Sequence, residues 1–224
     1  MTRFDAIWLD AGGVLVLPDP TVLGPLLAYY GGSADIDRHR RAHYAAMAVK
    51  SAQGAQEMDW VEYDRAYVAS VGVPDDDVPD AAEALGRTRT ALLWRWPIPE
   101  SMTALAELAV GGVPLGVVSN ASGQIEAVLG RSRICQVGPG DGVPMRCIVD
   151  STLVGVAKPD PRIFDHAEVH FAGVARERVA YVGDSVTMDI GGATAAGLHP
   201  ILLDPYDDHP DAPFERIKQL GDLV

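Results

Sequence analysis

Six polar residues of this 224-residue chain stand at or just beyond the ends of short apolar segments. They are Asp10, Ser119, Asn120, Lys158, Asp184 and Asp189. In open parallel sheets, ligands bind beyond the carboxyl ends of the strands, so residues at these points are expected to meet. Carboxylate oxygens suit a hard cation such as Mg²⁺, and hydroxyl and ammonium groups suit the oxygens of an anionic substrate. The pattern therefore predicts one site that binds both a cation and an anion.

The apolar segments themselves indicate the strands of a single sheet. They are Phe4–Leu9, Val113–Ser119, Val179–Val182 and Pro200–Leu203. Helical patterns lie between them, at Ser101–Val110, Gly123–Leu129, Pro161–Phe171 and Met188–Ala196. Strands that alternate with helices imply a parallel sheet covered on both faces. We therefore predict an α/β protein with a Rossmann-like core.

Residues 18–96 interrupt this alternation because they lack strand-like runs and carry helical patterns. Helices are expected at Thr21–Tyr30, Asp35–Ala52, Trp60–Val71 and Asp77–Leu92. The aromatic residues of this segment are interpreted as its own core, and they are Tyr29, Tyr30, Trp60, Tyr63 and Tyr67. The predicted organisation is a core domain formed by residues 1–17 and 97–224, with a small helical domain of residues 18–96 inserted into it.

The four polar segments, in their order along the chain, resemble the four motifs of the haloacid dehalogenase superfamily. The segments are Asp10, then Ser119-Asn120, then Lys158 in Gly155–Pro159, then Asp184 and Asp189. A helical insertion after the first motif is similar to the cap domain of that superfamily. The resemblance covers the core on both sides of the insertion. It implies a hydrolase with an aspartate nucleophile.

The resemblance also implies a role for each motif residue. Asp10 is expected to attack a phosphoryl group and form an acyl phosphate, which water then cleaves. Asp10, the backbone carbonyl of Gly12, Asp184 and Asp189 are expected to hold Mg²⁺. Ser119, Asn120 and Lys158 are expected to bind the phosphate, and Lys158 also to orient Asp10. The implied substrate is a small phosphorylated metabolite.

Gly12 departs from the pattern of this superfamily. Most of its phosphatases carry a second aspartate there, which protonates the leaving oxygen and later activates water. General acid–base catalysis of this kind contributes about 10²–10⁴-fold. One interpretation is a phosphatase whose substrate has an easy leaving group, such as a sugar 1-phosphate. A phosphatase is also possible if a residue elsewhere in the chain supplies the proton to the leaving oxygen.

Two alternatives stay open at this point. Phosphonoacetaldehyde hydrolases also have a small residue at this position and form a Schiff base through a cap lysine. Lys50 is the one lysine of the predicted cap among three in the chain, and an exposed helix lysine is the preferred interpretation for it. The other alternative is a phosphate-binding or partner-binding protein that retains the site and has lost efficient turnover.

The segment Asp37–Tyr44 contains the basic cluster of this acidic chain. His39 and His43 lie four residues apart and therefore share one helical face. Either imidazole could replace the missing acid because it titrates near neutral pH. The alternative is a solvated helix face whose arginines pair with nearby acidic residues.

Composition limits the possible partners. The formal net charge of −13 argues against binding to a nucleic acid backbone. No apolar segment approaches the roughly 18 residues needed to span a bilayer, so no membrane partner is expected. The N-terminal residues do not resemble a secretion signal, and we expect a cytoplasmic protein in which Cys135 and Cys147 are reduced. The sequence does not predict the oligomeric state.

One further segment has two interpretations. Residues Arg131–Arg146 form a connection interrupted by glycine and proline, with Gly138–Pro144 at its centre. An ordinary surface loop is expected, and a flap facing the substrate is the alternative.

Overall fold

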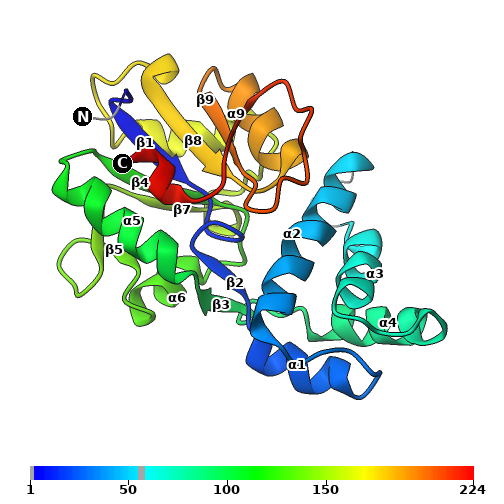
Figure 1. Cartoon of the computed structure of the whole chain (residues 1–224). Helices are drawn as coiled ribbons and strands as arrows, with labels where there is room; N and C mark the ends of the chain where they lie inside the picture. Colours follow the sequence, from blue (N-terminus) through cyan, green and yellow to red (C-terminus); the bar gives the residue numbers. More distant parts are fainter. Residues whose placement is uncertain (1–2, 55–58) are drawn as a thin grey trace.

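A six-stranded parallel sheet forms the centre of the computed structural model, which describes residues 3–54 and 59–224 (Figure 1). Its strands in spatial order are β10 (Glu215–Ile217), β9 (His199–Leu203), β8 (Val179–Gly183), β1 (Ala6–Leu9), β4 (Leu115–Ser119) and β7 (Ile148–Asp150). Every pairing within the sheet is parallel. The predicted α/β class is confirmed, and the carboxyl ends of the strands share one edge.

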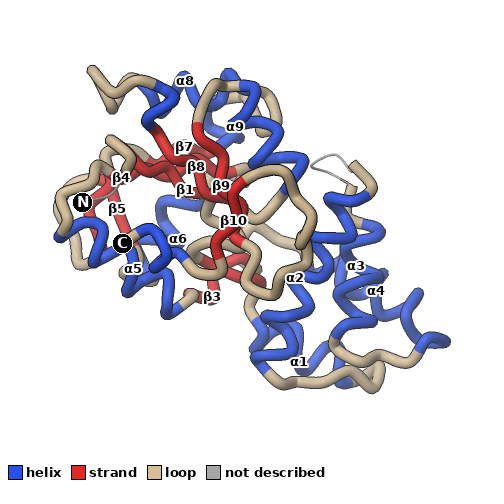
Figure 2. Tube along the Cα trace, turned by 45° about the horizontal axis from the view of Figure 1, so that its top comes forward, coloured by secondary structure: helices blue, strands red, loops and turns tan. Residues whose placement is uncertain are grey.

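Both faces of the sheet are covered, as Figure 2 shows. Successive side chains of β1 point to opposite faces: Ile7 and Leu9 pack in one apolar cluster, and Ala6 and Trp8 in another. The first cluster includes residues of α5 (Pro99–Val110) and α6 (Ile125–Arg131). The second includes residues of α8 (Asp165–Glu168) and α9 (Gly191–Ala195). This two-sided burial explains the uniformly apolar central strands.

Four helices lie together beside the sheet (Figure 1), and in the chain they fall between β2 (Val16–Pro18) and β3 (Trp94–Pro97). They are α1 (Pro20–Ala28), α2 (Ile36–Ala52), α3 (Val61–Ser70) and α4 (Val78–Thr88). Their apolar side chains form a separate cluster that includes Tyr63 and Tyr67. The antiparallel pair of β2 and β3 joins this helical insertion to the core.

Side chains at the helix starts explain where two of these helices begin. The carboxylate of Asp19 accepts a hydrogen bond from the backbone N–H of Thr21, and Pro20 occupies the first turn of α1. The carboxylate of Asp35 accepts one from the backbone N–H of Arg38 at the start of α2. None of the helices in the described residues is both long and apolar enough to cross a membrane.

Several predicted elements differ from the observed ones. Residues 18–96 do contain strand structure, because Trp94–Pro97 pairs with Val16–Pro18. The single helix predicted at Pro161–Phe171 is a 3₁₀ turn at Pro161–Phe164 followed by the four-residue α8. The helix predicted at Met188–Ala196 is a π-helical turn at Val186–Ile190 followed by α9. The predictions from helical periodicity therefore gave longer regular α-helices than the structure contains in these two segments.

The Gly/Pro-interrupted connection also contains regular structure. It holds the short paired strands β5 (Cys135–Val137) and β6 (Val143–Met145). The side chain of Gln136 bonds to the backbone of Gly142 across the turn. Cys135 and Cys147 are both free thiols, and burial raises the pKa of each to about 12. The short α7 (Ser151–Val154) follows β7.

Candidate active site

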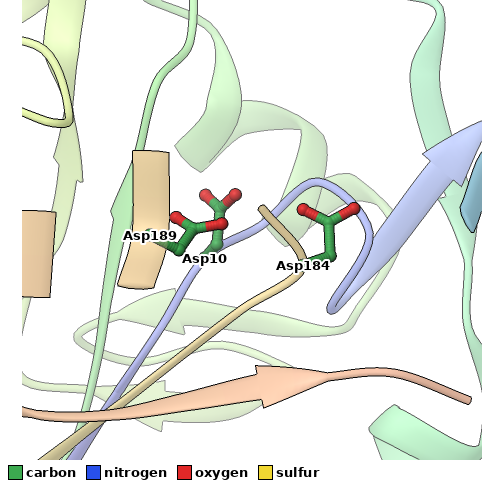
Figure 3. A group of neighbouring side chains, drawn as sticks. All are labelled: Asp10, Asp184 and Asp189. Atoms are coloured by element: carbon green, nitrogen blue, oxygen red, sulfur yellow. The ribbon is translucent and has the colours of Figure 1, made fainter. Parts of the chain in front are cut away.

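Three carboxylates meet at the carboxyl edge of the sheet (Figure 3). Asp10 directly follows β1, Asp184 directly follows β8, and Asp189 lies in the π-helical turn Val186–Ile190. One oxygen atom from each residue lies within 4.8 Å of the others. A donor set made only of carboxylate oxygens suits a hard cation.

A buried lysine joins two of these carboxylates. The Nζ atom of Lys158 lies 3.0 Å from Oδ1 of Asp10 and 2.6 Å from Oδ1 of Asp189. It also donates a hydrogen bond of 2.8 Å to the hydroxyl of Tyr181. The side chain of Lys158 is about 1% exposed, so the ammonium is held entirely by these partners.

Burial and charge set the protonation of this pair. Burial raises the pKa of Asp10 to about 7, opposed by Lys158 and reinforced by Asp189 and Asp184. Burial alone would lower the pKa of Lys158, but Asp10 and Asp189 raise it above its usual value. The lysine is therefore a permanent cation. A divalent cation would offset the remaining negative charge of the three carboxylates.

Two glycines permit the close approach of these carboxylates to the backbone. Gly13 has a φ of +68°, and a Cβ atom there would lie 1.9 Å from Oδ2 of Asp184. A Cβ atom on Gly183 would lie 2.1 Å from Cγ of Asp189. Any larger residue at either position would displace a carboxylate. The backbone N–H of Ser185 donates to Oδ2 of Asp189 and fixes that side chain further.

The residues of the second and third motifs also lie at this edge. Ser119 is buried at the end of β4 and lines the cavity next to Asp10. The amide of Asn120 bonds to the backbone of Lys158 in both directions, with distances of 2.8 and 3.0 Å. Asn120 lines the same cavity and, in addition, holds the loop that carries Lys158.

A cavity of about 270 Å³ opens above the carboxylates. Its core side includes Asp10, Gly12, Ser119, Asn120, Lys158, Asp184 and Asp189. The insertion and its connection to β3 contribute Met47, Lys50, Trp60, Arg89, Thr90 and Ala91 to the lining, and β3 contributes its first residue, Trp94. The cavity thus brings together all the residues predicted from the four motifs and one of the three predicted from the insertion, Lys50. The segment Gly138–Pro144 is not part of its lining among the described residues.

Trp94 occupies the space beside Gly12. A Cβ atom on Gly12 would lie 3.3 Å from two atoms of the Trp94 ring. A longer side chain at position 12 therefore has to move the indole, which itself packs edge-to-face against His43. The absence of a carboxylate at this position and the presence of Trp94 fit each other sterically.

The two histidines of α2 have different environments. His43 is buried, with Nε2 2.8 Å from Oδ2 of Asp184 and Nδ1 2.9 Å from the hydroxyl of Tyr63. His39 contacts the backbone carbonyl of Ser33 and the hydroxyl of Tyr67, and lies against a second cavity near β2 and β3. In this arrangement His39 lies away from the three carboxylates, because both of its ring nitrogens contact groups of the insertion.

The basic cluster of α2 is mainly a set of ion pairs with the core. Arg40 pairs with Glu100, and Arg41 pairs with Asp208. In the same helix, the hydroxyl of Tyr44 donates to the backbone carbonyl of Gly13. The arginines are therefore paired, but not with nearby acidic residues as expected: Glu100 and Asp208 lie in the core, so these ion pairs and the Tyr44 hydrogen bond attach α2 to the core.

Sequence reasoning missed several residues of the site. Tyr181 lies inside an apolar strand and gives no signal apart from being the one polar ring in Val179–Val182. Its hydroxyl lies 2.8 Å from the carbonyl of Val118, and burial raises its pKa well above the usual value. Trp60, Arg89 and Trp94 reach the cavity from three separate segments, and nothing in their spacing predicts this convergence.

A parallel sheet with an inserted helical group, three carboxylates and a buried lysine at its carboxyl edge defines a class of hydrolases with an aspartate at the end of the first strand. A family model described as haloacid dehalogenase-like hydrolase matches residues 4–197. The chain belongs to this family of haloacid dehalogenase-like hydrolases.

Curated relatives lie within the same family. The chain is 33% identical over 145 residues to a phosphoserine phosphatase of Thermus thermophilus, covering 64% of this chain and 54% of that protein. It is 28% identical over 176 residues to the pyrimidine 5′-nucleotidase YjjG of Escherichia coli, covering 73% and 75%. The chain therefore spans little more than half the length of the first of these relatives.

Solved structures share the fold. A HAD phosphatase from Thermococcus onnurineus has a TM-score of 0.58 at 19% identity, covering 97% of this chain and 95% of that one. A dehalogenase captured with an intermediate has a TM-score of 0.61 at 19% identity, covering 100% and 96%. At this identity the likeness concerns the fold alone.

Proposed function

We propose that the protein is a Mg²⁺-dependent phosphatase that hydrolyses a small phosphorylated metabolite through a phospho-aspartate at Asp10. The observation that carries this proposal is the arrangement of Asp10. Its carboxylate lies 3.0 Å from the Lys158 ammonium and within 4.8 Å of Asp184 and Asp189, on the wall of one cavity. The phosphatases among the relatives favour this reaction over the phosphonatase and binding-protein alternatives.

The proposed reaction has two steps. An oxygen of Asp10 attacks phosphorus, the bond to the ester oxygen breaks, and an acyl phosphate forms; water then cleaves it and regenerates Asp10. Asp10, Asp184 and Asp189 would hold Mg²⁺ together with the carbonyl of Gly12. The ion would supply positive charge against the anionic substrate and nucleophile.

Ser119 and Lys158 would contact the phosphoryl oxygens in this reaction. Lys158 keeps its proton because Asp10 and Asp189 surround it, so it offers a fixed positive charge to the transition state. Asn120 would bind the phosphate. Through its hydrogen bonds to the backbone of Lys158, it would also keep the Lys158 side chain in position. The buried tyrosine Tyr181 holds the ammonium from the other side.

Gly12 limits the leaving group in this proposal. No side chain at position 12 can protonate the ester oxygen, so a substrate whose oxygen leaves as a weak base, such as a sugar 1-phosphate, is favoured. His43 is an indirect contributor at most, since its two ring nitrogens already bond to Asp184 and Tyr63. We propose that His43 holds the Asp184 carboxylate in position.

The proposal is tested by measuring phosphate release from a panel of phosphorylated metabolites with Mg²⁺ and with EDTA. In parallel, the enzyme is quenched rapidly during turnover and analysed by mass spectrometry for a phosphoryl group on Asp10. Release that requires Mg²⁺, together with phospho-Asp10, is expected. Absence of release from every ester would overturn the proposal.

Mg²⁺ is expected to stabilise the folded protein through the three carboxylates. At a concentration about 100 times the Kd, binding to the native state adds about 2.7 kcal/mol, which raises Tm by roughly 5–10 °C for a chain of this size. Asp184→Asn is expected to remove most of this shift, whereas Asp211→Asn, which changes an exposed carboxylate, retains it. Thermal unfolding with increasing Mg²⁺ measures both. An undiminished shift in Asp184→Asn contradicts the assignment.

Adding the missing carboxylate alone is expected to give no gain. In Gly12→Asp the new side chain meets the Trp94 ring, so hydrolysis of an alkyl phosphate should not rise. Gly12→Asp combined with Trp94→Leu should exceed Gly12→Ala with Trp94→Leu by about tenfold or more, since a positioned acid contributes about 10²–10⁴-fold. Steady-state kcat/KM values measure this. A large gain in the single variant Gly12→Asp shows that Trp94 is not the obstacle.

A further inference from the structure

Two cations of the helical insertion contact one aromatic ring on the wall of the cavity. The Nζ atom of Lys50 lies 3.5 Å from the centroid of the Trp60 ring, and Cζ of Arg89 lies 4.4 Å from it. Both distances are within the range of a favourable cation–π contact. All three residues line the cavity that contains Asp10.

These residues come from different parts of the insertion and are fixed there. Lys50 is in the last turn of α2 and is 3% exposed, and the next residue, Ser51, accepts a hydrogen bond from the backbone N–H of Val186 in the core. Trp60 directly precedes α3, and Arg89 directly follows α4. The ends of three helices therefore form this wall.

Asp64 supports Arg89 from outside the cavity. The two side chains form an ion pair, and Asp64 lines a separate hollow on the surface. Burial raises the pKa of Asp64 to about 6, while Arg89 and Lys50 oppose this shift. The guanidinium is thus oriented by a carboxylate that does not itself reach the Asp10 cavity.

The core side and the insertion side of the cavity differ in charge. Its core side holds three carboxylates, Asp10, Asp184 and Asp189, which are the expected cation ligands, against one lysine, Lys158. Its insertion side holds Lys50 and Arg89, and no acidic residue lines that side among the described residues. Two of the three lysines of this acidic chain, Lys50 and Lys158, face this one cavity.

We propose that Lys50 and Arg89 form a subsite for a second anionic group on the phosphorylated metabolite, either a carboxylate or a second phosphate. This inference rests on the proposed function, in which the first phosphoryl group lies at Asp10. Anionic oxygens are the groups that ammonium and guanidinium ions bind most strongly, and the partly desolvated wall strengthens the attraction. Trp60 orients both cations and excludes water from them.

The same contacts disfavour a nucleobase at this subsite. A base would have to stack on the Trp60 ring, but two cations already lie over that ring. A metabolite of a few carbons with an acidic group at each end fits both the difference in charge between the two sides and the cavity of about 270 Å³. The subsite thus narrows the substrate class to doubly acidic phosphate esters.

The test compares esters in matched pairs. One pair is glucuronate 1-phosphate and glucose 1-phosphate, which differ in a carboxylate; the other is glucose 1,6-bisphosphate and glucose 1-phosphate, which differ in a phosphate. In all three compounds the anomeric oxygen is the easy leaving group that Gly12 favours. Wild-type kcat/KM is expected to favour the doubly acidic member of at least one pair by about 10- to 100-fold, the range for a hydrogen bond to a charged group. The favoured pair identifies which anion is bound.

In Lys50→Gln and Arg89→Gln this preference is expected to fall by about tenfold each, mainly through KM. Arg87→Gln is the matched control, because Arg87 is an exposed arginine in the last turn of α4, two residues before Arg89, where it pairs with Glu83. It should keep the wild-type preference. A wild type that hydrolyses both members of each pair equally, or variants that retain the preference, would overturn the subsite while leaving the phosphatase intact.

A failure of the phosphatase proposal can be distinguished from a failure of the subsite proposal. If the wild type releases phosphate from none of these esters and from no other member of the metabolite panel, the phosphatase proposal fails. The subsite is then read by calorimetric titration of the same compounds into wild type and Lys50→Gln. Tighter binding of the doubly acidic member by wild type alone supports the subsite, and equal binding refutes it.

Discussion

Asp10→Asn is expected to lower phosphate release by at least about 10⁴-fold, the largest loss predicted for any single change in this protein. An amide at this position cannot form the acyl phosphate, so neither step of the reaction can proceed through this intermediate. The substitution preserves size and the hydrogen bond from the backbone N–H of Ala11. Phosphate release under saturating substrate and Mg²⁺ measures the effect.

Without metal, the stability of the wild type is expected to fall as pH rises from about 4 to about 7, and the same variant should lack this dependence. Burial raises the pKa of Asp10 to about 7, so folding disfavours its ionised form, and this penalty grows as pH rises from about 4 to about 7. Above pH 7 the penalty is complete, and the neutral amide of Asp10→Asn avoids it. The variant also removes one partner of Lys158, so the readout is the pH dependence: between pH 4 and pH 8 in EDTA, Tm should fall more for the wild type than for Asp10→Asn.

A control at the other end of the same strand separates chemistry from folding. Asp5→Asn changes a carboxylate that precedes β1 and pairs with Arg178 on the surface. It should retain wild-type turnover. If Asp10→Asn turns over at a rate near that of Asp5→Asn, Asp10 is not the nucleophile.

The sheet and the motif residues could be predicted because both follow from the pattern of residues within short segments of the chain. A buried parallel strand needs a continuous apolar run, and the first polar residue after it lies at the carboxyl edge, as Asp10 and Asp184 do. The order of four such ends along the chain then implies that they share one site. Neither step requires knowledge of distant contacts.

The insertion side of the cavity was less predictable because it depends on tertiary packing. His39 and His43 share a helical face in the sequence, yet only His43 reaches Asp184. One helical turn separates a residue that packs inside the insertion from one at the interface with the core. Trp94 likewise reaches Gly12 only because β3 pairs with β2. Such positions follow from how the helices dock, which periodicity does not encode.

Lys158→Met is expected to impair both stability and turnover. Removing the ammonium leaves Asp10 and Asp189 buried beside each other without their cation, and breaking a buried ion pair from one side costs about 3–5 kcal/mol. The transition state also loses a fixed positive charge, worth about 10²–10³-fold in rate. Chemical denaturation in EDTA and phosphate release with Mg²⁺ measure the two effects.

Mg²⁺ is expected to separate these two effects. The ion neutralises the carboxylates, so it should restore much of the lost stability of Lys158→Met, but it leaves the position of the ammonium empty, so turnover should stay low. Lys218→Met is the matched control because Lys218 is an exposed lysine far along the chain, and it should resemble wild type in both measurements. If Mg²⁺ restores turnover of Lys158→Met together with stability, Lys158 only balances charge in the folded state and does not act on the phosphoryl group.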